Sequence, residues 1–199
     1  MTQPCRVLIP IILLGCILLP TISWADNLSD SNTSWAAGKA LWDEKNYEDA
    51  LIAFNNSTVL NPANDQAWFY KGLTLARLGR NEDAIAAYEV VSTINPENAA
   101  VWFNKGTNLA WLNRTDEALV AYDKAIELDP AYAFPWYNKG NILADSDQYQ
   151  EALDSYNRAV ELDPTFTLAW KAKANILAKL GKVTESVDSY NIAKALEDS

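Results

Sequence analysis

The sequence of 199 residues contains no histidine and only two cysteines, Cys5 and Cys16. Histidine is the commonest general base and the commonest metal ligand, so its absence argues against most hydrolytic and metal-dependent sites. Because both cysteines lie in the first sixteen residues, a disulfide framework, a zinc site or a catalytic thiol is poorly supported elsewhere. We therefore expect a binding protein with no catalytic residues, no metal and no cofactor.

Basic residues are also scarce. The chain has 16 Lys and Arg against 26 Asp and Glu, which gives a net charge of -10. An acidic surface repels phosphate backbones, so nucleic acid is not an expected partner. Carboxylate pairs such as Glu82-Asp83 and Asp116-Glu117 are expected at the starts of helices, where negative charge favours the helix dipole. Their placement thus has a structural explanation that does not require acid–base catalysis.

The first 25 residues have the order of a secretory signal peptide. One basic residue, Arg6, precedes an apolar run over residues 7–22, and the small residues Ser23 and Ala25 follow. The run is shorter than the roughly 20 apolar residues of a spanning helix. We predict a signal peptide at 1–25 cleaved after Ala25, and an exported protein that is secreted, periplasmic or on the outer cell surface.

Two other interpretations of this segment stay open. The stretch 13–16 (LLGC) resembles a bacterial lipobox, which would place a lipid on Cys16, and an uncleaved segment would anchor the chain through residues 7–24. In all three cases the remainder lies outside the cytoplasm and touches a membrane only through its N-terminal segment. The polar residues 26–33 predict a flexible tether, which we place at 26–30.

The body of the chain repeats every 34 residues. Five kinds of residue recur at this interval, a pattern typical of a solenoid built from stacked supersecondary units. The recurring residues are Trp68, Trp102, Trp136 and Trp170; Pro62, Pro96, Pro130 and Pro164; Gly38, Gly72, Gly106 and Gly140, then Ala174; Phe54, Tyr88, Tyr122, Tyr156 and Tyr190; and Ala50, Ala84, Ala118 and Ala152, then Ser186.

Each unit is predicted to hold two helices. Trp68, Gly72 and Leu75 share one helical face, and a second face begins after the turn signal at 79–81. Pro96 ends that second helix. The small residues of the first helix allow close approach, and the aromatic residues of the second fill the space beside them.

This pattern resembles the tetratricopeptide repeat family, whose signature is carried here by Trp68, Gly72, Ala84, Tyr88 and Pro96. The resemblance covers residues 31–199 as five units, at 31–64, 65–98, 99–132, 133–166 and 167–199. It implies an all-α, right-handed superhelical solenoid of antiparallel helix pairs. It also implies a non-catalytic module that binds a protein or peptide in a concave groove lined by the first helices. The end units depart most, at Ser34 and Trp35 and at Ala174, Ser186 and Lys194.

The groove positions that the resemblance implies are aromatic toward the N-terminus and rich in amides later. The candidate binding residues are Trp35, Trp42, Phe69, Phe103, Asn104, Trp111, Tyr137, Asn138, Asn141 and Asn175. Trp42 and Trp111 stand in columns that otherwise hold small or charged residues, so we expect them to be exposed ligand contacts. The other aromatic residues have a second interpretation, packing against the neighbouring repeat.

Lysine precedes the Gly or Ala column at Lys71, Lys105, Lys139 and Lys173. We predict that each lysine lays its methylene stem along a tryptophan and keeps its ammonium in water. The alternative is a basic ladder that binds an anionic partner.

The sequence thus predicts an exported protein–protein interaction scaffold. Two alternatives stay open: a cell-surface module that binds glycans by aromatic stacking and asparagine hydrogen bonds, and an envelope assembly protein that self-associates through the fifth repeat. Possible glycosylation sequons occur at Asn27, Asn32, Asn55, Asn56 and Asn113.

Overall fold

The computed structural model describes residues 24–198, which form ten α-helices and no strand. The helices are α1 (Trp24–Asp43), α2 (Tyr47–Leu60), α3 (Asp65–Arg77), α4 (Asn81–Ile94), α5 (Ala99–Trp111), α6 (Thr115–Leu128), α7 (Ala133–Asp145), α8 (Tyr149–Leu162), α9 (Thr167–Lys179) and α10 (Val183–Glu197). Each predicted repeat holds one odd-numbered and one even-numbered helix. The predicted all-α solenoid is therefore confirmed.

The turn inside each repeat uses one residue with a left-handed backbone. Gly79 and Gly181 have φ of 73° and 75°, and Lys45, Asn113 and Asp147 adopt φ of 63°, 57° and 59° at the same position of the repeat. A left-handed residue reverses the chain directly after a helix, and glycine adopts this conformation without steric cost. The turn signal at 79–81 therefore marks the helix reversal that the sequence predicts.

A ring on the second helix of a repeat packs against a glycine on the first. A Cβ atom built on Gly106 would lie only 2.7 Å from a ring carbon of Tyr122, and Gly140 and Tyr156 show the same closeness at 2.6 Å. The rings of Tyr88 and Tyr122 are 0% and 1% exposed. The 34-residue spacing of glycine and tyrosine therefore reflects one repeated helix–helix contact.

Tryptophan and proline link the repeats at their junctions. Trp68 Nε1 donates to the carbonyl of Pro62 at 3.0 Å, and Trp170 Nε1 donates to that of Pro164 at 2.9 Å. Proline follows the last residue of the preceding helix by two positions, as predicted from its inability to continue a helix. Each of these tryptophans thus holds the loop between one repeat and the next.

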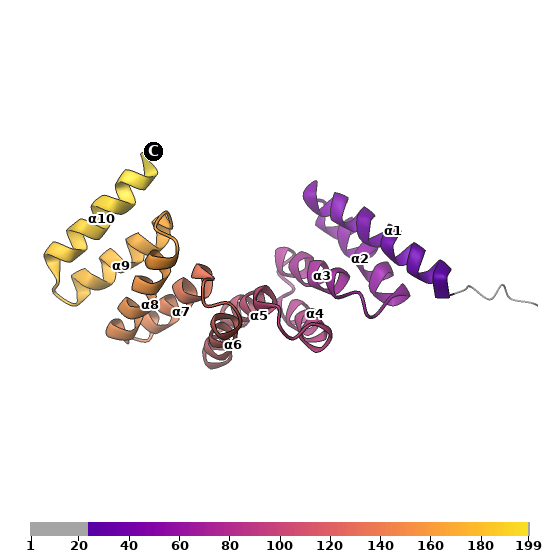
Figure 1. Ribbon diagram of the computed structural model, residues 1–199, viewed down its shortest axis with the longest axis horizontal. Helices are drawn as coiled ribbons and strands as arrows, with labels where there is room; N and C mark the ends of the chain where they lie inside the picture. The colour runs from indigo at the N-terminus through magenta and orange to yellow at the C-terminus, as the bar shows by residue number, and fades with distance from the viewer. Residues whose placement is uncertain (1–23, 199) are drawn as a thin grey trace, which may run out of the picture.

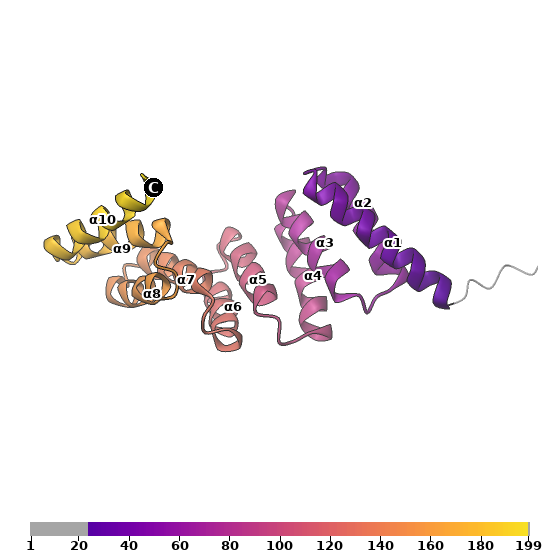
Figure 2. The same cartoon turned by 45° about the horizontal axis from the view of Figure 1, so that its top comes forward.

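The repeats stack into an elongated, curved array with α1 and α10 at opposite ends (Figures 1 and 2). Each odd-numbered helix contacts the next odd-numbered helix, whereas within residues 24–198 the even-numbered helices do not contact one another. The odd-numbered helices therefore form the closely spaced inner layer, and the even-numbered helices form a more widely spaced outer layer. This is the arrangement that places the first helix of each unit along the concave side.

The segment expected to be a tether belongs instead to α1. Residues 26–30 are helical, and the adjoining Ser31 is buried, where its Oγ donates to the carbonyl of Ser57 at 3.0 Å. Ser57 Oγ in turn donates to the carbonyl of Ser31 at 2.9 Å, so these two bonds tie α1 to α2. A polar composition misled the sequence-based prediction because a helix can bury serines that satisfy one another.

The predicted leader, 1–25, lies almost wholly outside the described residues, so its cleavage and its alternatives stay predictions. Over residues 24–198, no helix combines the length and the apolar character needed to cross a bilayer.

A candidate binding site on the inner helices

Trp111 is the most exposed of the predicted groove aromatics. It ends α5, and 76% of its side-chain surface is accessible. The residue lines two neighbouring hollows, one shared with repeat 2 and the other with repeat 4. A large apolar ring at the boundary of two hollows is suited to contact a partner from both sides.

The hollow between repeats 3 and 4 has a volume of about 610 Å³ and a polar wall. Asn141 accepts a hydrogen bond from Tyr156 Oη at 2.8 Å, and Asn138 Nδ2 donates to Tyr122 Oη at 3.4 Å. Because each phenol comes from the same buried column that packs on glycine, the rigid core fixes the direction of each amide. The predicted residues Asn138, Asn141 and Trp111 are thus brought together.

The hollow between repeats 2 and 3 measures about 490 Å³ and is lined by Leu73, Arg77, Asn104 and Asn108 beside Trp111. Asn104 Nδ2 donates to the backbone carbonyl of Ala100 at 2.7 Å. This bond uses one amide hydrogen of Asn104 and does not use its Oδ1, which can accept a hydrogen bond. The wall therefore combines an apolar ring, an amide acceptor and one guanidinium.

Trp42 does not occupy an exposed position as expected. Its ring lies 5.8 Å from Tyr70 and 6.2 Å from Tyr47 in edge-on contacts, and its Nε1 is buried without a partner. Comparing equivalent positions of the repeats did not reveal that tyrosines from α2 and α3 pack against this tryptophan. Trp42 is therefore part of the packing between repeats 1 and 2.

The aromatic residues at the fifth position of each repeat pack mainly on neighbouring rings. Trp35 lies 6.3 Å from Tyr70, and Phe69 lies 6.1 Å from Tyr88. Phe103 and Tyr137 make the same kind of contact, at 6.1 Å from Tyr122 and 6.0 Å from Tyr156. All four are half-buried, so they form the floor of the inner surface. Asn175 is exposed on α9 and lines neither hollow beside Trp111.

Three further aromatic residues extend this floor and were missed in the sequence. Phe134 is 47% exposed and lies 4.9 Å from Phe166, and Tyr132 lies 5.1 Å from Phe103. Earlier repeats carry Asn64 and Asn98 where Tyr132 and Phe166 stand. A comparison of this position across the repeats would have shown the change from asparagine to an aromatic residue.

The lysine column lies beside tryptophans, as predicted. Lys71 Nζ lies 4.5 Å from the centre of the Trp68 ring, and Lys173 Nζ lies 4.8 Å from that of Trp170. Burial lowers the pKa of both lysines, because a desolvated ammonium is less stable than a hydrated one. Both lysines therefore make cation–π contacts with a tryptophan. These contacts agree with the predicted packing role and not with the alternative of a basic ladder.

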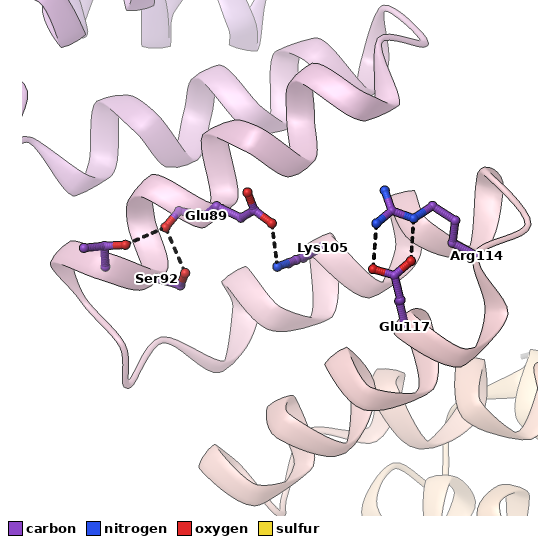
Figure 3. Close-up of polar contacts among 6 residues, drawn as sticks. Glu89, Ser92, Lys105, Arg114 and Glu117 are labelled. Atoms are coloured by element: carbon purple, nitrogen blue, oxygen red, sulfur yellow. Dashed lines mark hydrogen bonds and ion pairs between the residues drawn. The ribbon is translucent and has the colours of Figure 1, made fainter.

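Acidic partners neutralise the other two lysines of the column. Lys105 Nζ of α5 lies 2.9 Å from Glu89 of α4 (Figure 3), and Lys139 Nζ lies 2.5 Å from Asp123. Each pair joins a second helix to the first helix of the next repeat. The column therefore supports the stack and presents no continuous basic surface.

The predicted carboxylate pairs stand in the first turns of α4 and α6. Arg114 donates two hydrogen bonds to Glu117, as Figure 3 shows, and these bonds lower the pKa of that carboxyl. Arg80 holds Asp83 in the same way at 2.6 Å. Over residues 24–198, no cluster of acidic or sulfur-containing side chains has the form of a metal site.

Comparison with known proteins agrees with this architecture. Two family models, both described as tetratricopeptide repeat, match residues 36–93 and residues 99–132 and 133–166. No curated protein sequence matches the chain.

Solved structures share the fold at low sequence identity. A crystal structure of MamA is 20% identical with a TM-score of 0.75, and the match covers 81% of this chain and 94% of that one. The type IV pilus biogenesis factor PilW is 23% identical with a TM-score of 0.74, over 85% and 78% of the two chains. YrrB, a TPR protein with an unusual peptide-binding site, is 18% identical with a TM-score of 0.69, over 89% and 93% of the two chains. Since the family models together cover more than half of the sequence, the chain belongs to the tetratricopeptide repeat family, whose members mediate protein–protein interaction.

Proposed function

We propose that this protein is a non-catalytic scaffold of the extracytoplasmic space that binds an extended peptide segment of a partner protein on its inner helices. The observation that carries the proposal is Trp111, a 76% exposed ring between two amide-lined hollows. The repeat itself does not need a tryptophan there, because the same position holds Arg77 in repeat 2 and Asp145 in repeat 4.

The chemistry of the hollows suits a peptide backbone. Carboxamides such as those of Asn104 and Asn138 offer both donor and acceptor groups, which match the N–H and C=O groups of an extended chain. The buried tyrosine column holds the inner helices in place, so a partner orders little of this surface when it binds. YrrB, a TPR protein with an unusual peptide-binding site, shows that this fold can carry such a site.

Photo-crosslinking in the native cell tests this proposal. A photoreactive residue at Asn141 faces the hollow, whereas one at Val120 reports the outer side, where that valine is 68% exposed. We expect a protein adduct from position 141 that is lost in the Trp111→Ala background and is absent from position 120. Adducts of equal yield from both positions would contradict the site.

A binding screen distinguishes peptide binding from glycan binding. Sugar rings also stack on tryptophan and bond to asparagine, so the protein is offered both a displayed library of unstructured peptides and a glycan array. Selected peptides should bind roughly 30-fold more weakly to Trp111→Ala, the effect of losing a hot-spot tryptophan worth about 2 kcal/mol. Binding to glycans alone would overturn the peptide proposal.

The extracytoplasmic location rests on the order of basic, apolar and small residues over 1–25. N-terminal sequencing of the protein from its own cells should begin at Asp26. A protein that retains Met1 in the cytoplasmic fraction would contradict export.

A further inference from the structure

Repeats 4 and 5 meet through two apolar contacts between the second helix of one repeat and the first helix of the next. In repeats 4 and 5, Leu153 of α8 and Ile176 of α9 share one apolar cluster, where they are 3% and 4% exposed. Val160 of α8 and Phe166, which precedes α9, share another. The junction of repeats 4 and 5 is therefore built from one apolar pair in mid-helix and a second apolar pair near the loop.

Each end of the array carries half of the first contact. Val187 of α10 stands 34 residues after Leu153 but is 51% exposed, and Ala40 of α1 occupies the position of Ile176 and is also exposed. Val183 and Tyr190 extend the open face of α10, with 66% and 56% of their surfaces accessible. Nothing among residues 24–198 covers this face.

The second contact is replaced at the two ends by opposite charges. Lys194 stands 34 residues after Val160, and Asp30 of α1 occupies the position in its repeat that Phe166 occupies in repeat 5. Both side chains are exposed. If a second α1 were placed on α10 as α9 lies on α8, the Val160–Phe166 contact would become a Lys194–Asp30 ion pair.

The net charges of the ends agree with this match. Residues 167–199 hold five lysines against four acidic residues, whereas residues 24–64 hold two lysines against six acidic residues. The C-terminal repeat is thus weakly basic in a strongly acidic chain, and its counterpart at the other end is acidic. Opposite charges steer two such ends together.

We propose that the open face of α10 binds α1 of a second copy, so that the solenoid continues from one molecule into the next. Figure 1 shows α1 and α10 at opposite ends of the array, so one chain cannot make this contact with itself. Because the two surfaces differ, the contact is heterologous and can repeat into a filament. Trp111 lies at neither end, so partner binding and assembly are separate activities.

Sedimentation of the protein, purified as its own cell processes it, tests the proposal. We expect the average mass to rise with concentration and to fall with added salt, which screens the charged ends. Lys194→Asp and Asp30→Lys should each weaken association by about tenfold, because each places like charges together, and the double exchange should restore it. Val187→Glu should weaken association to a similar degree, whereas Val120→Glu, the same change at a more exposed valine on the outer side, should not.

Zero-length carbodiimide crosslinking identifies the contact itself. The expected product joins Lys194 of one copy to Asp30 of another and disappears in either single variant. A monomer at every concentration, or a product joining two C-terminal repeats, would overturn the head-to-tail arrangement. Trp111→Ala should leave sedimentation unchanged, so a failure here is distinguishable from a failure of the peptide-binding proposal.

Discussion

At the residue scale, the ring that faces a glycine is held differently from repeat to repeat. Tyr156 donates its hydroxyl hydrogen to Asn141, whereas the buried hydroxyl of Tyr88 has no partner. Phe54 fills the same slot in repeat 1 with no hydroxyl at all. A buried hydroxyl without a hydrogen bond is destabilising, so the slot favours phenylalanine wherever no acceptor is near.

Tyr88→Phe should stabilise the protein by about 1 kcal/mol, because it removes an unsatisfied buried group. Tyr156→Phe should instead lower the free energy of unfolding by about 1 kcal/mol, since it breaks the bond to Asn141. Urea titration of the three proteins checks both signs. Equal effects of the two changes would show that the hydroxyl environment does not decide the outcome.

Tyr88 should also make the stability of the protein depend on pH. Burial raises the pKa of Tyr88 above its usual value, so the folded state favours the neutral phenol. Its contribution to stability is therefore complete below about pH 10, the pKa of an unfolded tyrosine, and is lost as the pH rises further. Thermal midpoints measured from pH 8 to 11 should decline less steeply for Tyr88→Phe. A parallel decline in both proteins would mean that other tyrosines, such as Tyr122 and Tyr156, dominate.

The two tryptophans that looked equivalent in the sequence should differ in stability. Trp42→Ala removes a ring packed between Tyr47 and Tyr70 and should cost about 3 kcal/mol. Trp111→Ala should change the free energy of unfolding by less than about 0.5 kcal/mol, because its ring is mostly in solvent. Chemical denaturation gives both values, and a large loss for Trp111 would reassign it to the core.

At the element scale, the turns inside the repeats show where backbone strain lies. Lys45 adopts φ of 63° where Gly79 and Gly181 stand in other repeats. A non-glycine residue in this region costs about 1 kcal/mol. Lys45→Gly should therefore raise the free energy of unfolding by up to that amount, and Gly79→Lys should lower it similarly. Thermal unfolding of both variants checks the pair of signs; a loss of stability in Lys45→Gly would speak against strain.

The helices themselves were largely predictable from spacing. Trp68, Gly72 and Leu75 share a face of α3 because their i, i+4 and i+7 spacing is close to whole turns of an α-helix. The start of α1 was not predictable from its polar composition, because the bonds between Ser31 and Ser57 that tie it to α2 depend on the tertiary structure. For the site, the columns located Trp111 but not the closure of Tyr70 over Trp42, since that depends on side-chain directions between helices.

At the scale of the whole molecule, each repeat depends on its neighbours. The buried residues of α6 are Ala118, Ala121, Tyr122 and Ala125, whereas α10 buries only Ser189 and Ala193. Contacts in such an array are local, so an end unit is supported from one side. Stability should consequently fall toward the C-terminal end.

Amide hydrogen exchange should show this gradient directly. We expect amides of α10 to exchange at least tenfold faster than those of α6, because the last repeat opens without the rest. Measuring at low protein concentration avoids any protection by a second copy. Uniform protection along the chain would instead indicate a single cooperative unit.

The separation of the outer helices has a mechanical consequence. Because α2, α4, α6, α8 and α10 do not contact one another, the spaces between them can widen or narrow without breaking a direct helix–helix contact on that side. The inner helices, which do touch, act as the hinge line of this motion. The curvature of the array can therefore change through many small rotations between repeats, shared along its length.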